Sequence, residues 1–357
     1  IPEKPKEGGL VAVYPGTSKT AKPILLIAHI DVVEAKRDDW ERDPFIMVEE
    51  NGYFYGRGTA DIKSQAAVWV DTLIRFQQAG YKPKRTVKMA LTCGEETNGA
   101  FNGIEWLAAN KRDLIDLETR NPGGHSSAPV PDNAIYQLAR AVTKIEDYRF
   151  PLEMTATTRR FFAEAGAVRG DATGAAMVAL AKNNADKGAE AIVNKDPFLH
   201  SNLRTTCVAT LLDGGHAANA LPQRAGANIN CRIFPGHSIE SIKDELAKVI
   251  GDPGVTITQL PPKRPAPPAP PLDPKIIGPM EKLVAKYWPG LKVIPSMANG
   301  YTDATFLGAV GIPTYGIPGM WGDPDGNGAH GLNERMEVKS VYVGRDYMFD
   351  LVKAYAD

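Results

Sequence analysis

The stretch Ile24-Leu25-Leu26-Ile27-Ala28-His29-Ile30-Asp31 is an unbroken apolar run that ends in a histidine and a carboxylate two positions apart. An apolar run bounded by polar residues is typical of a central strand that helices cover on both faces. Residues i and i+2 of a strand point the same way, so His29 and Asp31 leave it on one side. That geometry suits a metal-binding imidazole with a carboxylate near enough to orient it. The alternative is a surface strand end that carries polar residues.

The composition is that of an ordinary globular protein, since 43% of the 357 residues are hydrophobic and 23% are charged. A chain of this length can bury a sizeable core and form two domains. The 41 basic and 42 acidic residues nearly cancel, which argues against a nucleic-acid or anionic-membrane partner. No apolar run is long enough to span a bilayer.

The three cysteines, Cys93, Cys207 and Cys231, are too few and too scattered for a disulfide framework. All sit in strand-like runs, so we predict buried free thiols rather than a bridge or metal ligands. The chain begins at Ile1, without methionine, in a segment that looks like the approach to a strand. We therefore expect further residues upstream. Because these could include a signal peptide, the compartment stays open between cytoplasmic and secreted or periplasmic.

Strands alternate with helices through the first third of the chain. A strand is predicted over 10–13, and a hairpin over 46–48 and 53–55 turns at Asn51-Gly52, the strongest short turn signal. Apolar residues at helical spacing predict a helix over 64–80. A second buried strand is predicted over 87–92, followed by Cys93-Gly94-Glu95-Glu96. This alternation is typical of the α/β class, in which functional residues gather beyond the carboxyl ends of strands.

The composition of the sequence changes near Leu117. Residues 117–260 are predicted to form an inserted domain, and a Pro-rich extended linker over 261–271 ends it. The remainder is expected to return to the first domain. It should contain a helix over 275–287, strands at 293–294 and 314–317, a Gly-rich loop with His330, and a helix over 341–355.

Adjacent carboxylates repel one another, so Glu95-Glu96 in a mainly buried context needs cations to stay ionised. A divalent metal beside one carboxylate and a proton-accepting role for the other would meet that need. The alternative is a solvated loop with both side chains in water.

Four ordered motifs carry a family resemblance: Ala28-His29-Ile30-Asp31, Gly56-Arg57-Gly58-Thr59-Ala60-Asp61-Ile62-Lys63, Gly94-Glu95-Glu96-Thr97 and Gly328-Ala329-His330-Gly331. In this order they resemble the dizinc metallopeptidase family of glutamate carboxypeptidases, succinyl-diaminopimelate desuccinylases, aminoacylases and carnosinases. The resemblance implies an α/β catalytic domain, residues 1–116 and 261–357, with a mixed, mostly parallel sheet flanked by helices. It also implies that 117–260 is an inserted α+β lid or dimerisation domain.

The resemblance assigns roles to single residues. It makes His29 a ligand of one metal, His330 a ligand of the other, Asp61 the bridging ligand and Glu96 a terminal ligand. Glu95 would be the general base and Asp31 the partner that orients His29, and the Asp61-Ile62 peptide bond would be cis. The implied cofactors are two Zn²⁺ ions, although Co²⁺ or Mn²⁺ would accept the same ligand types.

The segment 213–222 resembles the family's lid motif. This implies that His216 donates to the developing oxyanion in a neighbouring subunit's active site, within a homodimer formed through the lid domain, and that Asn219 supports substrate binding. A histidine in an ordinary Gly-rich turn is the alternative. Arg232 could pair with a substrate carboxylate or be a surface arginine. For His125, in the segment 121–127, we expect a hinge or structural role.

One metal ligand that the family resemblance implies has no counterpart in this sequence. A further acidic ligand is expected on the strand after the helix that follows Glu96, but residues 117–120 already resemble the first strand of the lid. Asp116 is the only acid near that place, and it lies too early. We expect that a few dozen residues are missing from the sequence, rather than that the protein has lost a metal site.

The leading hypothesis is a zinc-dependent hydrolase of amide bonds in small peptides, of the dipeptidase or carboxypeptidase type, that uses a metal-activated water. An N-acyl-amino-acid deacylase would use the same metals with a different pocket. A metal-free binding homologue is the alternative from another class, but a decayed site should have lost some of its ligands. The expected partner is a small peptide or N-acyl amino acid, with neither nucleic acid nor membrane.

Overall fold

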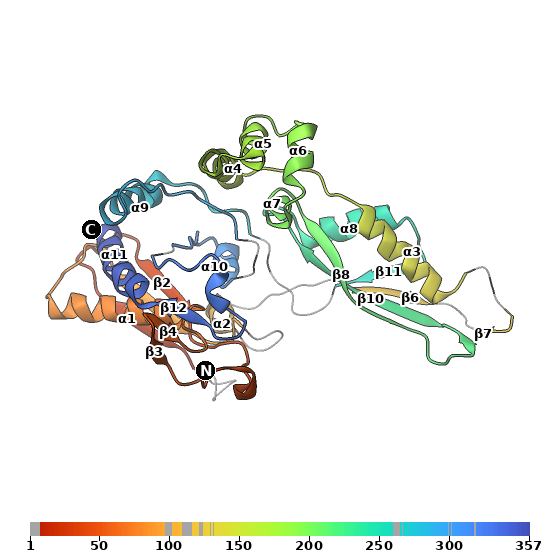
Figure 1. Cartoon of the computed structure of the whole chain (residues 1–357), viewed down its shortest axis with the longest axis horizontal. Coiled ribbons are helices and arrows are strands. Elements are labelled where there is room, and N and C mark those ends of the chain that lie inside the picture. Colours follow the sequence, from red (N-terminus) through yellow and green to blue (C-terminus); the bar gives the residue numbers. More distant parts are fainter. Residues whose placement is uncertain are drawn as a thin grey trace. The chain divides into compact units, whose positions relative to one another are not determined.

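The computed structural model describes residues 8–96, 102–108, 116–120, 124–128, 130, 132–259, 265, 267–298, 300, 302–317 and 319–357. The chain forms two compact units (Figure 1). Unit 1 comprises Ile1–Ala109, Leu272–Val293 and Tyr315–Asp357, and unit 2 comprises Asn110–Pro271 and Ile294–Thr314. Among the described residues, no helix combines the length and the apolar character needed to cross a bilayer.

Unit 1 contains a three-stranded sheet in the order β1-β5-β2. The central strand β5 (Val87–Thr92) pairs antiparallel with β1 (Leu10–Tyr14) and parallel with β2 (Ile24–His29). The prediction of an α/β protein with a mixed sheet is therefore confirmed, but one of the two described pairings is antiparallel, so the described sheet is not mostly parallel. The interpretation of the 24–29 run as a central strand was wrong for the described part of the sheet, because β2 lies at its edge and Leu25 is 38% exposed. An apolar run predicts a strand but not its place in the sheet.

Helices cover this sheet through apolar faces. The long helix α1 (Lys63–Gln78) buries Ala66, Val68 and Phe76, and Trp69 Nε1 donates to the carbonyl of Ile27 in β2 at 3.1 Å. The predicted helices over 64–80, 275–287 and 341–355 are confirmed. The other described helices of unit 1 are α2 (Gly103–Ala108), α9 (Pro274–Tyr287) and α11 (Val338–Ala356), with the 3-10 turns η1 (Arg37–Asp39) and η2 (Gly326–Gly328).

A second, small sheet joins distant parts of the chain. The predicted hairpin is present as β3 (Val48–Glu50) and β4 (Tyr53–Tyr55), with positive φ angles at Asn51 and Gly52. β12 (Arg335–Glu337) pairs antiparallel with β4, so that Arg335 lies opposite Tyr55. This pairing brings the segment after His330 beside the loop that follows β4.

Unit 2 contains a four-stranded antiparallel sheet in the order β11-β6-β10-β8. Leu138 of one covering helix and Leu246 of the other pack with Ile229 of the sheet in one core. A short ladder joins β7 (Gly124–His125) to β9 (Ala220–Leu221). The bounds of the larger elements are β6 (Asp116–Arg120), β8 (Thr206–Gly214), β10 (Arg224–Arg232), β11 (Val255–Thr258), α3 (Ala134–Asp147) and α8 (Ile239–Ile250).

A helical cluster with its own core lies in the chain between α3 and β8 (Figure 1). Phe162, Met177 and Leu180 are buried at its centre. Its helices are α4 (Ala156–Arg169), α5 (Ala172–Lys182), α6 (Lys187–Val193) and α7 (Pro197–Ser201). The short helix α10 (Ala304–Ala309) also belongs to unit 2.

Two predictions about local structure were wrong. The described residues 293–294 and 314–317 form no strand, and Pro295 and Pro313 beside them lack the N–H that a ladder needs. Cys207 and Cys231 form a disulfide instead of remaining free thiols, because they lie directly opposite each other in the β8–β10 ladder. Cys93 takes no part in this disulfide.

Some predictions fall on residues that the structure does not describe. These are Thr97 of the third motif, residues 121–123 of the expected hinge and residues 261–264 and 266 of the Pro-rich linker. The side chains of Asp116 and His125 also lie outside the described part.

Candidate metal centre

The parallel pairing of β2 and β5 gathers polar side chains at one edge of the sheet. His29 ends β2 and lies opposite Thr92, the last residue of β5. Glu95 and Glu96 follow in the turn after β5. The carboxyl ends of parallel strands meet at the same edge, which is why residues more than sixty positions apart come together.

Asp61 joins this group from the loop between β4 and α1. Its Oδ1 lies 3.3 Å from His29 Nε2, and the Asp61-Ile62 peptide bond is cis, as the resemblance implies. One ligand atom each from His29, Asp61 and Glu96 lie within 4.8 Å of one another. The side chains of His29 and Glu96 are buried, whereas the side chain of Asp61 is 30% exposed.

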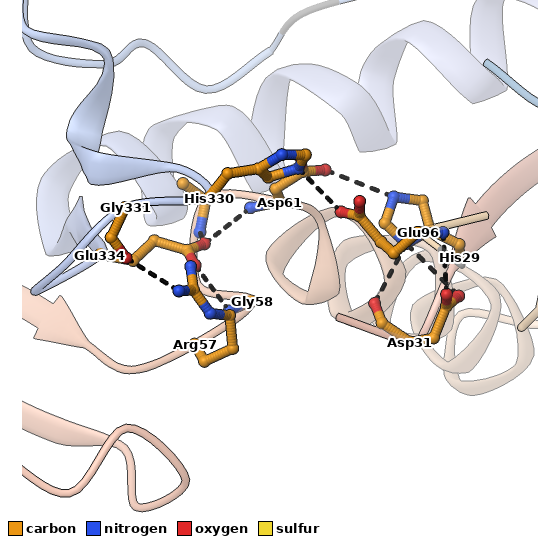
Figure 2. A network of polar contacts seen from close by, with 10 residues as sticks. His29, Asp31, Arg57, Gly58, Asp61, Glu96, His330, Gly331 and Glu334 are labelled. Carbon is orange, nitrogen blue, oxygen red and sulfur yellow. Dashed lines mark hydrogen bonds and ion pairs between the residues drawn. The ribbon is translucent and has the colours of Figure 1, made fainter. Parts of the chain in front are cut away.

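His330 reaches the same cluster from the far end of the sequence (Figure 2). Its Nε2 lies 2.9 Å from Asp61 Oδ2 and 3.0 Å from Glu96 Oε1. The backbone of His330 has a φ of 59°, within the Gly-rich turn after η2. The structure thus brings His29, Asp61, Glu96 and His330 together, with Glu95 in the adjoining turn.

Asp31 contacts two members of the cluster, but in a different way from the one expected. Its backbone carbonyl lies 3.1 Å from His29 Nδ1, whereas its carboxylate Oδ1 lies 3.7 Å away, too far for a hydrogen bond. The other carboxylate oxygen, Oδ2, accepts the backbone N–H of Glu96 at 3.0 Å. With a proton on Nδ1, His29 would donate to the Asp31 carbonyl and leave Nε2 facing Asp61.

The electrostatics of the cluster favour positive charge. Burial alone would lower the pKa of His29, but the hydrogen bond with Asp61 and the charges of Glu95 and Asp61 raise the pKa to about 9. Burial raises the pKa of Glu96, and the nearby Asp61 adds to this effect. The hydrogen bond from His29 lowers the pKa of Asp61. Such shifts are expected where several carboxylates share one partly buried site.

The donor set fits a divalent cation. Two imidazoles and two carboxylates are ligand types that zinc accepts, and Co²⁺ or Mn²⁺ can use the same set. Asp31 Oδ1 is buried and accepts no hydrogen bond from the described residues, so this oxygen of the carboxylate has no N–H or O–H donor to offset its share of the negative charge. A cation bound between His29, Asp61, Glu96 and His330 would offset that charge.

The residues expected to bind substrate or stabilise the oxyanion lie in unit 2, whereas the cluster lies in unit 1. His216 and Asn219 are exposed in the turn between β8 and β9, where the carbonyl of Asn219 accepts the N–H of Ser126 at 3.0 Å. Arg232 is exposed at the end of β10. Their roles stay predictions.

Sequence reasoning missed one buried pair beside the cluster, Arg57 and Glu334. The side chains are 3% and 1% exposed, and Arg57 Nη1 donates to Glu334 Oε2 at 2.8 Å. Arg57 stands inside a recognised motif, but nothing in the sequence indicates its partner. The β4–β12 pairing and the hydrogen bond from the N–H of Gly56 to the Glu334 carbonyl place Glu334 next to it.

The model of peptidase family M20/M25/M40 matches residues 25–354. Probable carboxypeptidase S-like 2 of Dictyostelium discoideum is 26% identical over 385 residues, which cover 96% of this chain and 74% of that protein. That alignment is longer than this chain, so some residues of the relative are aligned with gaps in this chain. N-fatty-acyl-amino acid synthase/hydrolase PM20D1 of Mus musculus is 24% identical. That alignment covers 95% of this chain and 75% of the mouse protein.

Among solved structures, a metallo-carboxypeptidase of Sulfolobus solfataricus aligns with a TM-score of 0.66 at 18% identity. The alignment covers 98% of this chain and 88% of that one. At this identity the likeness shows a shared fold and leaves the substrate open.

Proposed function

Because the chain belongs to peptidase family M20/M25/M40 and is a hydrolase of the metallopeptidase type, we propose that it cleaves an amide bond next to a free carboxylate in a small peptide. The observation that carries this proposal is the meeting of His330 Nε2 with Asp61 Oδ2 and Glu96 Oε1, beside His29. We propose that these four residues hold two Zn²⁺ ions, with Asp61 between them. Ions bound there would lower the pKa of water and polarise the amide carbonyl.

Glu95 is the proposed general base. It lies in the turn after β5, next to the ligand Glu96, and its charge already acts on His29. A carboxylate in that place can take the proton of the attacking water and pass it to the leaving amine. Asp31 orients two of the proposed ligands. Its backbone carbonyl lies within hydrogen-bond distance of His29 Nδ1, and its carboxylate accepts the N–H of Glu96.

We propose that the protein acts as a homodimer through unit 2. β8 is an edge strand of the described sheet, and Val208, Leu211 and Leu212 on it are 61%, 71% and 67% exposed. An exposed apolar edge strand is a surface that another strand can pair with. In such a dimer, His216 from one subunit would donate to the oxyanion in the site of the other, and Asn219 and Arg232 would bind substrate groups.

Deacylation of N-acyl amino acids is the second candidate. A relative over 95% of the chain bears the name N-fatty-acyl-amino acid synthase/hydrolase, and both reactions break an amide bond beside a carboxylate. The same metal ligands and the same base would serve either substrate.

The test is hydrolysis of matched substrates by the full-length, zinc-loaded protein. One panel contains dipeptides and the other contains N-acetyl and long-chain N-acyl forms of the same C-terminal amino acids. Faster turnover of the dipeptides, abolished by a chelator, is expected. Preference for the acyl panel would establish the deacylase instead, and no turnover of either panel would overturn the proposal.

A further inference from the structure

Glu334 is a buried carboxylate whose two oxygens each accept two hydrogen bonds (Figure 2). Oε2 accepts from Arg57 Nη1 at 2.8 Å and from the N–H of Gly58 at 3.0 Å. Oε1 accepts from the N–H of Ala60 at 2.8 Å and from the N–H of Asp61 at 3.0 Å. One side chain therefore binds the whole loop that ends at the proposed bridging ligand.

The same pair also fixes the segment that carries His330. Glu334 follows His330 by four residues, and its backbone carbonyl accepts the N–H of Gly56 at 3.0 Å. Arg57 Nη2 donates to the carbonyl of Gly331, the residue directly after His330, at 2.8 Å. The hydrogen bonds of Arg57 and Glu334 thus connect the loop that carries Asp61 to the turn that carries His330.

The pair lies in a dry environment. The guanidinium of Arg57 stacks over the ring of the buried Trp40 at 5.0 Å, and neither charged side chain is more than 3% exposed. In such surroundings hydrogen bonds are strong and a missing partner is costly. The loop therefore has little freedom to move while the carboxylate is in place.

We propose that Glu334 is a positioning residue for the metal centre, which sets the separation between the Asp61 carboxylate and the His330 imidazole. This inference rests on the proposed function. Its chemical basis is that Glu334 presents two acceptor oxygens to four donors. A glutamine in its place would present one oxygen and an NH₂ group, and the NH₂ group would face N–H donors that it cannot accept from. The loop would shift, and the ligand set would lose its geometry.

The test is titration of the chelator-treated full-length protein with Zn²⁺ by calorimetry, comparing wild type with Glu334→Gln. Mutation of a residue that orients a metal ligand typically weakens metal binding by about 10–100-fold, and we expect a loss in that range. Glu190→Gln is the matched control. It breaks another buried Arg–Glu pair, in which Arg204 Nη2 lies 2.6 Å from Glu190 Oε1, within unit 2.

A purely structural role would make both variants less stable to denaturant and leave zinc affinity unchanged in both. The expected result is weaker zinc binding in Glu334→Gln alone. Wild-type affinity in Glu334→Gln, or an equal loss in the control, would overturn the inference. If Glu334→Gln does not fold, Glu334→Asp decides in the same way. It keeps the charge opposite Arg57, but it is one methylene too short to reach all four donors.

The two proposals can fail separately. If wild type itself binds no zinc, the proposed function fails and this inference falls with it. If wild type binds zinc and the folded Glu334 variant binds it equally well, only the positioning role is refuted.

Discussion

His330 Nε2 lies 2.9 Å from Asp61 Oδ2, although 269 positions separate the two residues in the sequence. An imidazole and a carboxylate at this distance can be held together by a shared proton or by a cation. Glu96 contacts the same imidazole nitrogen at 3.0 Å, so three groups converge at one point. That convergence is the structural basis of the proposed metal centre.

Replacing Glu95 by glutamine should remove nearly all turnover without removing the metal. The amide keeps the size of the side chain but cannot accept the proton of water, so kcat should fall by about 10²–10⁴-fold. The measurement is steady-state hydrolysis together with metal content. Normal turnover in Glu95→Gln would remove this residue as the base.

The His216→Ala variant should lose about 10²–10³-fold in kcat while the oligomeric state stays unchanged. Mixing it with Glu95→Gln tests whether the histidine serves the neighbouring subunit. A mixed dimer contains one site with both Glu95 and His216 intact, so activity should partly return. Absence of rescue after confirmed subunit exchange would place His216 within its own chain's site.

The Cys207–Cys231 pair predicts a simple thiol count. Under denaturing, non-reducing conditions, one cysteine per chain, Cys93, should react with iodoacetamide, and after reduction all three should react. Mass spectrometry of the alkylated chain measures the number of modified cysteines directly. Reduction should also lower the free energy of unfolding by about 2–4 kcal/mol. Three reactive thiols in the protein purified without reductant would contradict the pairing.

The Arg204–Glu190 pair should make stability depend on pH. Hydrogen bonds from Arg204 and Lys187 hold the pKa of Glu190 below its ordinary value. A carboxyl group with a lowered folded pKa stabilises the protein above its unfolded pKa of about 4.3, and the contribution is lost as the pH falls through the folded pKa. Glu190→Gln should therefore lower the free energy of unfolding by about 1–3 kcal/mol at pH 7.

The same comparison at pH 3 should show a smaller difference between wild type and Glu190→Gln, measured by urea denaturation at both pH values. An equal difference at the two pH values would mean that the charge of Glu190 plays no part.

Much of the site could be predicted from the sequence because its residues stand at element ends. The end of an apolar run placed His29, and the end of the next strand placed Glu95 and Glu96. The parallel pairing of β2 and β5 then follows from the α/β pattern. His330 was predicted only through the resemblance, because no local pattern relates it to residues near the start of the chain.

Other features depend on pairings that local sequence does not encode. The bond between Cys207 and Cys231 requires the register of β8 against β10, which shifts between Asn228 and Ile229. The contact of Glu334 with Arg57 requires β12 to pair with β4. For the same reason, the 24–29 run predicted a strand correctly but not its place at the edge of the described sheet.

The central claim is that His29, Asp61, Glu96 and His330 bind a pair of metal ions. Elemental analysis of the full-length protein after loading with Zn²⁺ and removal of free metal tests it most directly, with Asp61→Asn as the comparison. We predict about two zinc ions per wild-type chain and fewer in the variant, since an amide offers one ligand oxygen and cannot bridge two ions. A wild-type protein that retains no metal would contradict the claim.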